Sequence, residues 1–316
     1  MKNPGMAICV AVITLLMAAP GFSQSESHQG QGRAVVTVLP RHEGAAPLSI
    51  TGQQLSINVN GKPAQVTSWK PLQGAENSLE LVVLIDGSAR ASLGNQLDSI
   101  AQFLKALPPN TRAAVAYMAY GRAVFAAPFS ADQAQVARQL HLPGGLPGSN
   151  ASPYFCLSDL AKNWPSTDRS ARREVLMVTN GVDNYERQYD PDDPYLQAAI
   201  ADSVRAGLVV YSIYWQSQIL ADSSQYQNNA GQNLLLEVAQ ATGGKSFWQG
   251  MGNPVSIQPF LDELARRLRN QYELRFAGTL KDKPEVESLK LKLSVTGAEV
   301  NAPQQVLVSP AASAQN

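Results

Sequence analysis

The turn at residues 86–90, with the sequence DGSAR, places an acid, a hydroxyl and a base directly after the apolar run 79–85. Carboxylate and hydroxyl oxygens are the ligands that hard divalent cations such as Mg²⁺ prefer. Arg90 opposes a cation there, because a guanidinium can donate a forked pair of hydrogen bonds to Asp86 and stand where the metal would stand. Asp86 and Ser88 also suit a purely local role, since both residue types cap helices and bond their own backbone.

The centre of the chain alternates strand-like and helix-like segments. Residues 79–85 are almost continuously apolar, which is typical of a strand covered on both faces, and apolar residues at helical spacing follow. This alternation predicts parallel βαβ units with helices on both sheet faces, and such sheets bind ligands at the carboxyl ends of their strands. The expected strands are 79–85, 112–120, 123–126, 175–179, 208–214 and 245–248, and the expected helices are 93–107, 131–140, 153–163, 194–206, 233–241 and 260–268.

Both ends of the chain carry strands with alternating apolar and polar residues. The pieces 55–59 and 64–69 flank the hairpin signal Asn60-Gly61, and residues 289–295 alternate strictly. We expect the two ends to pair into one small antiparallel β-sandwich, with the α/β domain inserted between them. The alternative is that each end packs separately on the α/β domain. The predicted fold class is therefore α/β, with a doubly wound, mostly parallel sheet of Rossmann-like type and a small β-sandwich.

The first 23 residues have the pattern of a secretory signal peptide, in which Lys2 precedes the apolar run 6–19 and small residues follow. This pattern predicts a secreted or periplasmic protein without a membrane span after cleavage; an uncleaved anchor is the alternative. The expected organisation is a signal peptide at 1–23, a linker at 24–33, an N-terminal β segment at 34–72, the α/β domain at 78–270, a C-terminal β segment at 271–309 that pairs with 34–72, and a disordered tail at 310–316.

The overall composition excludes several classes of function. Lys plus Arg and Asp plus Glu both number 25, so no whole-protein field favours nucleic acid. Cys156 is the only cysteine after the leader, which rules out a disulfide framework or a thiolate metal cage. No serine stands in a nucleophile elbow, no phosphate-binding glycine loop is present, and no base is placed beside Ser88. We therefore expect a protein that is not an enzyme, and a hydrolase using Asp86 and Ser88 is the disfavoured alternative.

Residues 79–270 resemble the von Willebrand factor A (VWA) domain. The metal-ion-dependent adhesion site of that family begins with D-x-S-x-S after the first apolar strand, adds a loop threonine and ends with the acid of a strand-terminal T-D-G. Asp86 and Ser88 match the first two positions. The flanks, through the hairpin at 55–69 and the run 264–274, resemble the secreted VWA-related proteins described from acidobacteria.

The remaining positions of the VWA site differ in this chain. Arg90 replaces the second serine, Ser152 is the counterpart of the loop threonine with Ser149 as a weaker choice, and Asn180 replaces the terminal acid. The resemblance implies Mg²⁺, but a lost carboxylate and a gained guanidinium each weigh against a dication by several kcal/mol at close range. We expect no cofactor, or at most weak Mg²⁺ or Ca²⁺ binding at Asp86, Ser88 and Ser152.

The resemblance and the loops predict a binding role at this edge. Tyrosines and acids crowd residues 184–195, and tyrosine makes good contact surface for a protein partner. Asp183 is either a substitute metal ligand or a solvated loop acid. We expect a protein or a cell-surface polymer as partner, with a weak metal-dependent adhesion module or a passive envelope assembly component as alternatives. The oligomeric state stays open. The expected partner-binding residues are Asp86, Ser88, Arg90, Asn180, Asp183, Tyr185 and Tyr189.

Overall fold

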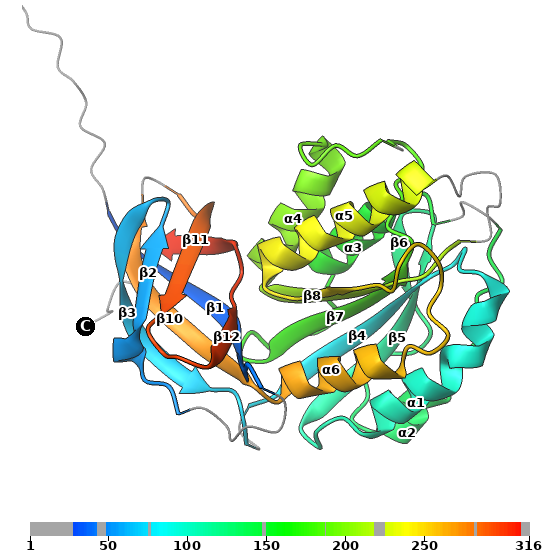
Figure 1. Ribbon diagram of the computed structural model, residues 1–316, viewed down its shortest axis with the longest axis horizontal. Coiled ribbons are helices and arrows are strands. Elements are labelled where there is room, and N and C mark those ends of the chain that lie inside the picture. Colours follow the sequence, from blue (N-terminus) through cyan, green and yellow to red (C-terminus); the bar gives the residue numbers. More distant parts are fainter. Residues whose placement is uncertain are drawn as a thin grey trace, which may run out of the picture.

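The computed structural model describes residues 28–42, 49–74, 77–146, 150–186, 188–217, 225–280 and 283–310. Thirteen strands and six α-helices lie in these ranges, and the strands form two sheets (Figure 1). The predicted signal peptide, Ser149 and residues 311–316 lie outside the described residues. Within the described ranges, no helix is long and apolar enough to cross a membrane.

Strands from both ends of the chain form one antiparallel sheet that closes on itself. Its order is β10-β3-β2-β11-β13-β1, and β1 pairs with β10 to close a barrel, while β12 extends from β1. Val36, Leu274 and Val308 are fully buried inside it. The strands are β1 (His28–Pro40), β2 (Leu55–Val59), β3 (Lys62–Pro71), β10 (Gln271–Leu280), β11 (Glu285–Leu293), β12 (Ala298–Asn301) and β13 (Gln305–Pro310), and a short 3₁₀ helix, Gly52–Gln54, precedes β2.

The predicted fold class is wrong for this chain. A closed six-stranded antiparallel barrel replaces the predicted sandwich, and this strand-rich architecture is not that of a doubly wound Rossmann-like protein. The physical reason lies in β1, whose 13 residues pair with β10 along one edge and with β13 and β12 along the other. Closure removes the free strand edges that a sandwich keeps. The linker prediction is wrong for residues 28–33, because they belong to β1.

The second sheet has the order β6-β5-β4-β7-β8-β9. Strand β4 pairs in parallel with β5 and β7, β8 pairs in parallel with β7 and β9, and β6 is antiparallel to β5. Side chains alternate along β4, so Leu81 and Val83 enter one core and Val82 and Leu84 the other. The strands are β4 (Leu79–Asp86), β5 (Thr111–Ala119), β6 (Arg122–Phe125), β7 (Arg172–Thr179), β8 (Leu208–Tyr214) and β9 (Ser246–Phe247).

Helices cover both faces of this second sheet (Figure 1). One face packs against α1 (Leu97–Lys105), α2 (Gln133–Ala137) and α6 (Gln258–Leu268), and the other against α3 (Pro153–Lys162), α4 (Pro194–Ala206) and α5 (Gln225–Thr242). A 3₁₀ helix, Ala91–Gln96, occupies the start of the helix predicted at 93–107. Helix α5 begins at Gln225 rather than at the predicted residue 233, and β12 has no counterpart among the predicted strands.

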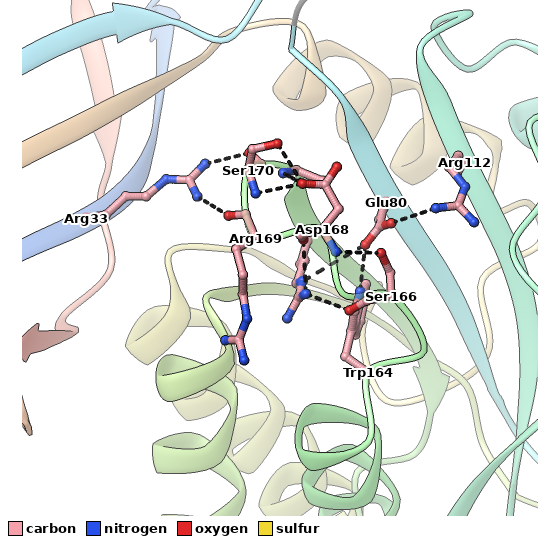
Figure 2. A network of polar contacts seen from close by, with 10 residues as sticks. Arg33, Glu80, Arg112, Trp164, Ser166, Asp168, Arg169 and Ser170 are labelled. Carbon is pink, nitrogen blue, oxygen red and sulfur yellow. Dashed lines mark hydrogen bonds and ion pairs between the residues drawn. The ribbon is translucent and has the colours of Figure 1, made fainter.

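The barrel lies against the loops that precede the parallel strands. Arg33 of β1 donates from Nη1 to the carbonyl oxygen of Arg169 at 3.0 Å and from Nη2 to that of Ser170 at 3.1 Å, just before β7 (Figure 2). Asn301 Nδ2 donates to the carbonyl oxygen of Gly243 at 3.2 Å, before β9. The barrel therefore occupies the amino ends of these strands, and Asp86 lies at the opposite edge.

Candidate functional site

Asp86, the last residue of β4, accepts four hydrogen bonds from neutral donors. Its Oδ1 accepts from the Ser88 backbone N–H at 2.8 Å and from Ser88 Oγ at 2.7 Å. Its Oδ2 accepts from Asn150 Nδ2 at 3.0 Å and from Thr179 Oγ1 at 2.7 Å. The residue is only 1% exposed, so the protein supplies all the hydrogen bonds that water would otherwise make.

The parallel sheet brings these donors to Asp86. Strands β4 and β7 are neighbours in register, with Ile85 opposite Val178, so Thr179 lies beside Asp86 where both strands end. Asn150 comes from the loop before α3, and its Oδ1 accepts from Asn184 Nδ2 at 2.9 Å. This second bond orients the Asn150 amide, because its oxygen is held by Asn184 and its nitrogen is left to face the carboxylate.

Burial raises the pKa of Asp86 above its usual value, because the charged form loses its hydration. The hydrogen bonds from Thr179, Ser88 and Asn150 act in the opposite direction by stabilising the carboxylate. The result is a buried acid whose carboxylate oxygens are held by neutral hydrogen-bond donors.

Ser152 and Asp183 form a second buried pair. Ser152 caps α3 by accepting from the Tyr154 backbone N–H at 3.2 Å, and its Oγ donates to Asp183 Oδ2 at 2.7 Å. Asp183 Oδ1 also accepts from the Tyr185 backbone N–H at 2.8 Å. Asp183 is 3% exposed and burial raises its pKa, so its interpretation as a solvated loop acid is wrong.

Arg90 does not pair with Asp86, contrary to the sequence-based expectation. Its Nε donates to the carbonyl oxygen of Ser217 at 2.8 Å, and its backbone N–H donates to that of Gln216 at 3.1 Å. Neutral side chains already donate hydrogen bonds to both oxygens of the Asp86 carboxylate. In addition, the chain after Ser88 lies beside the segment that follows β8, which brings Arg90 close to Ser217. Arg90 therefore links the turn after β4 to the segment after β8 through hydrogen bonds.

Asn180 serves the turn in which it lies. Its Oδ1 accepts from the Val182 backbone N–H at 3.1 Å, which is the side-chain turn that asparagine commonly makes. The structure thus brings Asp86 and Ser88 together, places Ser152 with Asp183, and leaves Asn180 bonded to its own loop. Sequence reasoning missed Asn150 and Thr179; the position of Thr179 at the end of a buried strand was the available signal.

The residues present do not fit a divalent cation of the VWA type. Both Asp86 oxygens already accept hydrogen bonds, and the group of Asn150 that faces them is an amide N–H, which cannot ligate a cation. Asp183, a second buried acid at this edge, is bonded to Ser152 and Tyr185. In the part of the chain that the structure describes, no three His, Cys, Asp or Glu side chains gather closely enough to hold a metal.

Exposed aromatic side chains cluster at the same edge. The Phe155 ring lies 5.2 Å from the Tyr185 ring and 4.9 Å from the Tyr195 ring, measured between centroids. Tyr185 and Tyr195 are 69% and 51% exposed. Tyr120, 83% exposed, sits in the β5–β6 turn whose Gly121 lies against Phe155. We call Tyr120, Phe155, Tyr185 and Tyr195 the tyrosine rim.

The residues expected to contact a partner differ in how exposed their side chains are to solvent. Asp86, Ser88 and Asp183 are at most 3% exposed, so they act on a partner only through the loops that they hold in place. Tyr185 is open to solvent. Tyr189 is 38% exposed, and its hydroxyl donates to Glu237 Oε1 on α5 at 3.2 Å. Arg90 and Asn180 are half-buried.

Comparison with known proteins does not assign the chain to a family. No family model matches it, and no curated protein matches it. Similar solved structures include an aerotolerance-related membrane protein from Bacteroides fragilis (13% identity, 60% of this chain and 98% of that chain, TM-score 0.41). Others are mussel byssus proximal thread matrix protein 1 with a zinc-occupied MIDAS motif (13%, 64% and 48%, 0.40) and the pilus adhesin SpaC from Lactobacillus rhamnosus GG (9%, 86% and 49%, 0.42). These identities and TM-scores are too low to transfer a family or a function.

Proposed function

We propose that this chain is an exported VWA-like protein that binds another protein through the tyrosine rim, without a metal ion. The observation that carries the proposal is the exposure of Tyr120, Tyr185 and Tyr195 around Phe155 at one edge of the sheet. Tyrosine offers a large, rigid and amphipathic contact surface at low entropic cost, and it is enriched in the energetically dominant parts of protein interfaces.

The charges beside the rim favour a partner with a basic surface. Asp190 and Asp192 are exposed in the segment that joins Tyr185 to Tyr195. Opposite charges across an interface speed association and exclude wrong partners. Binding should therefore weaken as the salt concentration rises.

Binding without metal is supported by the hydrogen bonds of Asp86. A cation would have to displace Asn150 Nδ2 and Thr179 Oγ1 from Oδ2, and both groups would then lose a buried partner. Calorimetric titration with Mg²⁺, Mn²⁺ and Ca²⁺ tests this part: we expect no binding tighter than millimolar. A micromolar signal that Asp86→Ala abolishes would favour a metal-dependent adhesion module instead.

A hydrolytic role for Ser88 finds no support in the geometry. Ser88 is 1% exposed and donates its hydroxyl proton to Asp86, so a substrate has no access to the oxygen. The proposed function is accordingly that of a binding protein rather than an enzyme.

Affinity capture from a cell-envelope extract tests the rim. The bait is the wild type or the double variant Tyr185→Ala/Tyr195→Ala. Trp248→Ala is the control, because this exposed aromatic residue follows β9, the edge strand at the opposite end of the sheet from β6. We expect the same proteins with the wild type and the control, and at least a tenfold reduction with the double variant. Unchanged capture by the double variant would point to a passive assembly component.

A further inference from the structure

A cavity of about 600 Å³ lies between the barrel and the parallel sheet. Strands β1, β10 and β13 form its barrel side, and residues 169–172 and 204–209 form its other side. This volume is in the range of pockets that hold small molecules, roughly 300–1,000 Å³. The cavity is at the amino ends of β7 and β8, so it is separate from the tyrosine rim.

The charged residues of the cavity wall are all positive among the described residues. Five arginines and no acidic residue from the described ranges line the cavity, although the whole chain has equal numbers of basic and acidic residues. A concave surface with one sign of charge concentrates ligands of the opposite sign. The arginines are Arg33, Arg169, Arg172, Arg205 and Arg275.

Nearby acids neutralise part of this charge. Glu273 pairs with Arg33 at 2.5 Å and with Arg275 at 2.7 Å, so one carboxylate serves two guanidinium groups. Asp202 pairs with Arg205 at 3.4 Å. The exposed guanidinium of Arg169 makes no hydrogen bond or ion pair within the described ranges, and in Figure 2 it lies apart from the network of polar contacts.

The loop that carries Arg169 is held in place. The carbonyl oxygens of Arg169 and Ser170 accept hydrogen bonds from Arg33. The Asp168 carboxylate accepts one from the Ser170 backbone N–H at 2.8 Å (Figure 2). Burial lowers the pKa of the neighbouring Arg173; the charges of Glu80 and Asp168 raise it, and those of Arg169 and Arg33 lower it. Like charges are thus fixed near one another, and a bound anion would relieve their repulsion.

Arg172 supplies a second, independent observation. It lines the cavity, is 4% exposed, and donates from Nη1 to the carbonyl oxygen of Leu268 at 2.9 Å and to Gln271 Oε1, and the buried Glu174 carboxylate lies near its guanidinium. Its Nε is buried and has no hydrogen-bond partner among the residues that the structure describes. An unsatisfied buried donor is costly, particularly on a charged group, so an acceptor oxygen at this position would be stabilising.

The rest of the wall is largely apolar. Val35 and Leu307 contribute half-buried side chains from the barrel, and Ala206 contributes one from the end of α4. An ion that carries only charge would leave this surface uncovered, whereas an apolar body would bury it at about 25 cal/mol per Å².

We propose that this cavity binds a small amphipathic anion, in which one carboxylate or phosphate group contacts Arg169 and Arg172 and an apolar body lies against Val35 and Leu307. The carboxylate and phosphate forms share this chemistry, and they come from different sources, such as a fatty-acid-like molecule or a phosphorylated lipid.

Calorimetry on the purified protein tests the proposal with octanoate, octyl phosphate, octanol and inorganic phosphate. We expect binding of octanoate, octyl phosphate or both, with the tighter one identifying the head group, and at least tenfold weaker binding of octanol and inorganic phosphate. Arg169→Glu should weaken the anion at least tenfold, while Arg138→Glu, an exposed arginine at the end of α2, should leave it unchanged.

Three results would overturn the proposal: no binding of either amphiphile at millimolar concentration, octanol binding as tightly as the anions, or equal losses with Arg138→Glu and Arg169→Glu. Thermal unfolding of each variant verifies that it is folded. The double variant Tyr185→Ala/Tyr195→Ala should bind the anion like the wild type, so a failure here leaves the proposed function of the rim unaffected.

Discussion

The side-chain nitrogen of Asn150 lies 3.0 Å from Oδ2 of Asp86, across 64 positions of sequence. This contact places a neutral donor against a buried carboxylate at the end of β4. It helps to offset the cost of burying an acid that is 1% exposed. The contact also makes the site sensitive to changes at either residue.

Asp86→Ala should destabilise the protein by about 3 kcal/mol. It leaves the buried donors of Ser88, Asn150 and Thr179 without their hydrogen-bond acceptor. Urea unfolding of wild type and variant measures this difference. Asp192→Ala, which removes an exposed acid from the loop before α4, should change the unfolding free energy by less than about 0.5 kcal/mol. Equal stabilities of the wild type and Asp86→Ala would contradict the hydrogen bonds described for Asp86.

Asn150→Asp should create a metal-dependent protein. It replaces a donor to Asp86 with a second carboxylate, and two adjacent buried carboxylates repel one another. We expect a loss of about 2 kcal/mol in the presence of a chelator, since a buried donor becomes a like charge. Millimolar Ca²⁺ should restore much of this loss in the variant and leave the wild type unchanged. Thermal unfolding with and without Ca²⁺ makes the comparison, and an equal response of both proteins would refute it.

Glu174 should make the protein less stable as the pH rises towards neutrality. Burial raises its pKa from 4.5 to about 7, although Arg172 and Gln271 act in the opposite direction. The folded state therefore binds more protons than the unfolded state between these values, and stability falls with increasing pH across that window.

The loss due to Glu174 should be about 2 kcal/mol between about pH 5 and about pH 7.5. Glu174→Gln removes this titration, so the difference in unfolding free energy between variant and wild type should grow in favour of the variant with pH. Denaturant unfolding at both pH values measures it. Parallel pH profiles for the two proteins would exclude Glu174 as the group responsible.

Gly231→Ala should disturb the edge that carries the site. A methyl group at Gly231 in α5 would lie 2.1 Å from the carbonyl oxygen of Asn180, so the helix and the loop must separate. We expect a loss of about 3 kcal/mol, even though alanine normally stabilises a helix relative to glycine. Gly252→Ala is the control, because no atom of the described residues lies within 4 Å of its added methyl group. If Gly231→Ala stabilises the protein, the close approach of α5 to this loop is disproved.

Gly32 and Phe276 should be energetically coupled across the barrel closure. They are paired residues of β1 and β10, and a methyl group at Gly32 would lie 2.2 Å from the Phe276 ring. Gly32→Ala should cost about 2 kcal/mol in the wild type and clearly less in a Phe276→Leu background, where the ring is absent. A double-mutant cycle by urea unfolding measures the coupling, and additive effects would show that the ring does not cover Gly32.

Local patterns in the sequence predicted much of the framework. The apolar run at 79–85 became β4, whose alternate side chains enter two cores, and Asn60 and Gly61 adopt the positive φ angles of the predicted hairpin turn. Asp86 and Ser88 are at the strand end where the sequence placed them. Such features depend on neighbours along the chain, and neighbours are visible in sequence periodicity.

Only the tertiary structure decided which distant groups meet. Barrel closure by β1 and β10, the donation from Asn150 to Asp86, the pairing of Ser152 with Asp183 and the attachment of Arg90 to Ser217 all join segments that are far apart in the chain. The cavity of arginines likewise exists only because the barrel docks against the parallel sheet. Residue type fixes what a side chain can bond, but strand register and domain docking select its partner, and one sequence contains no direct record of either.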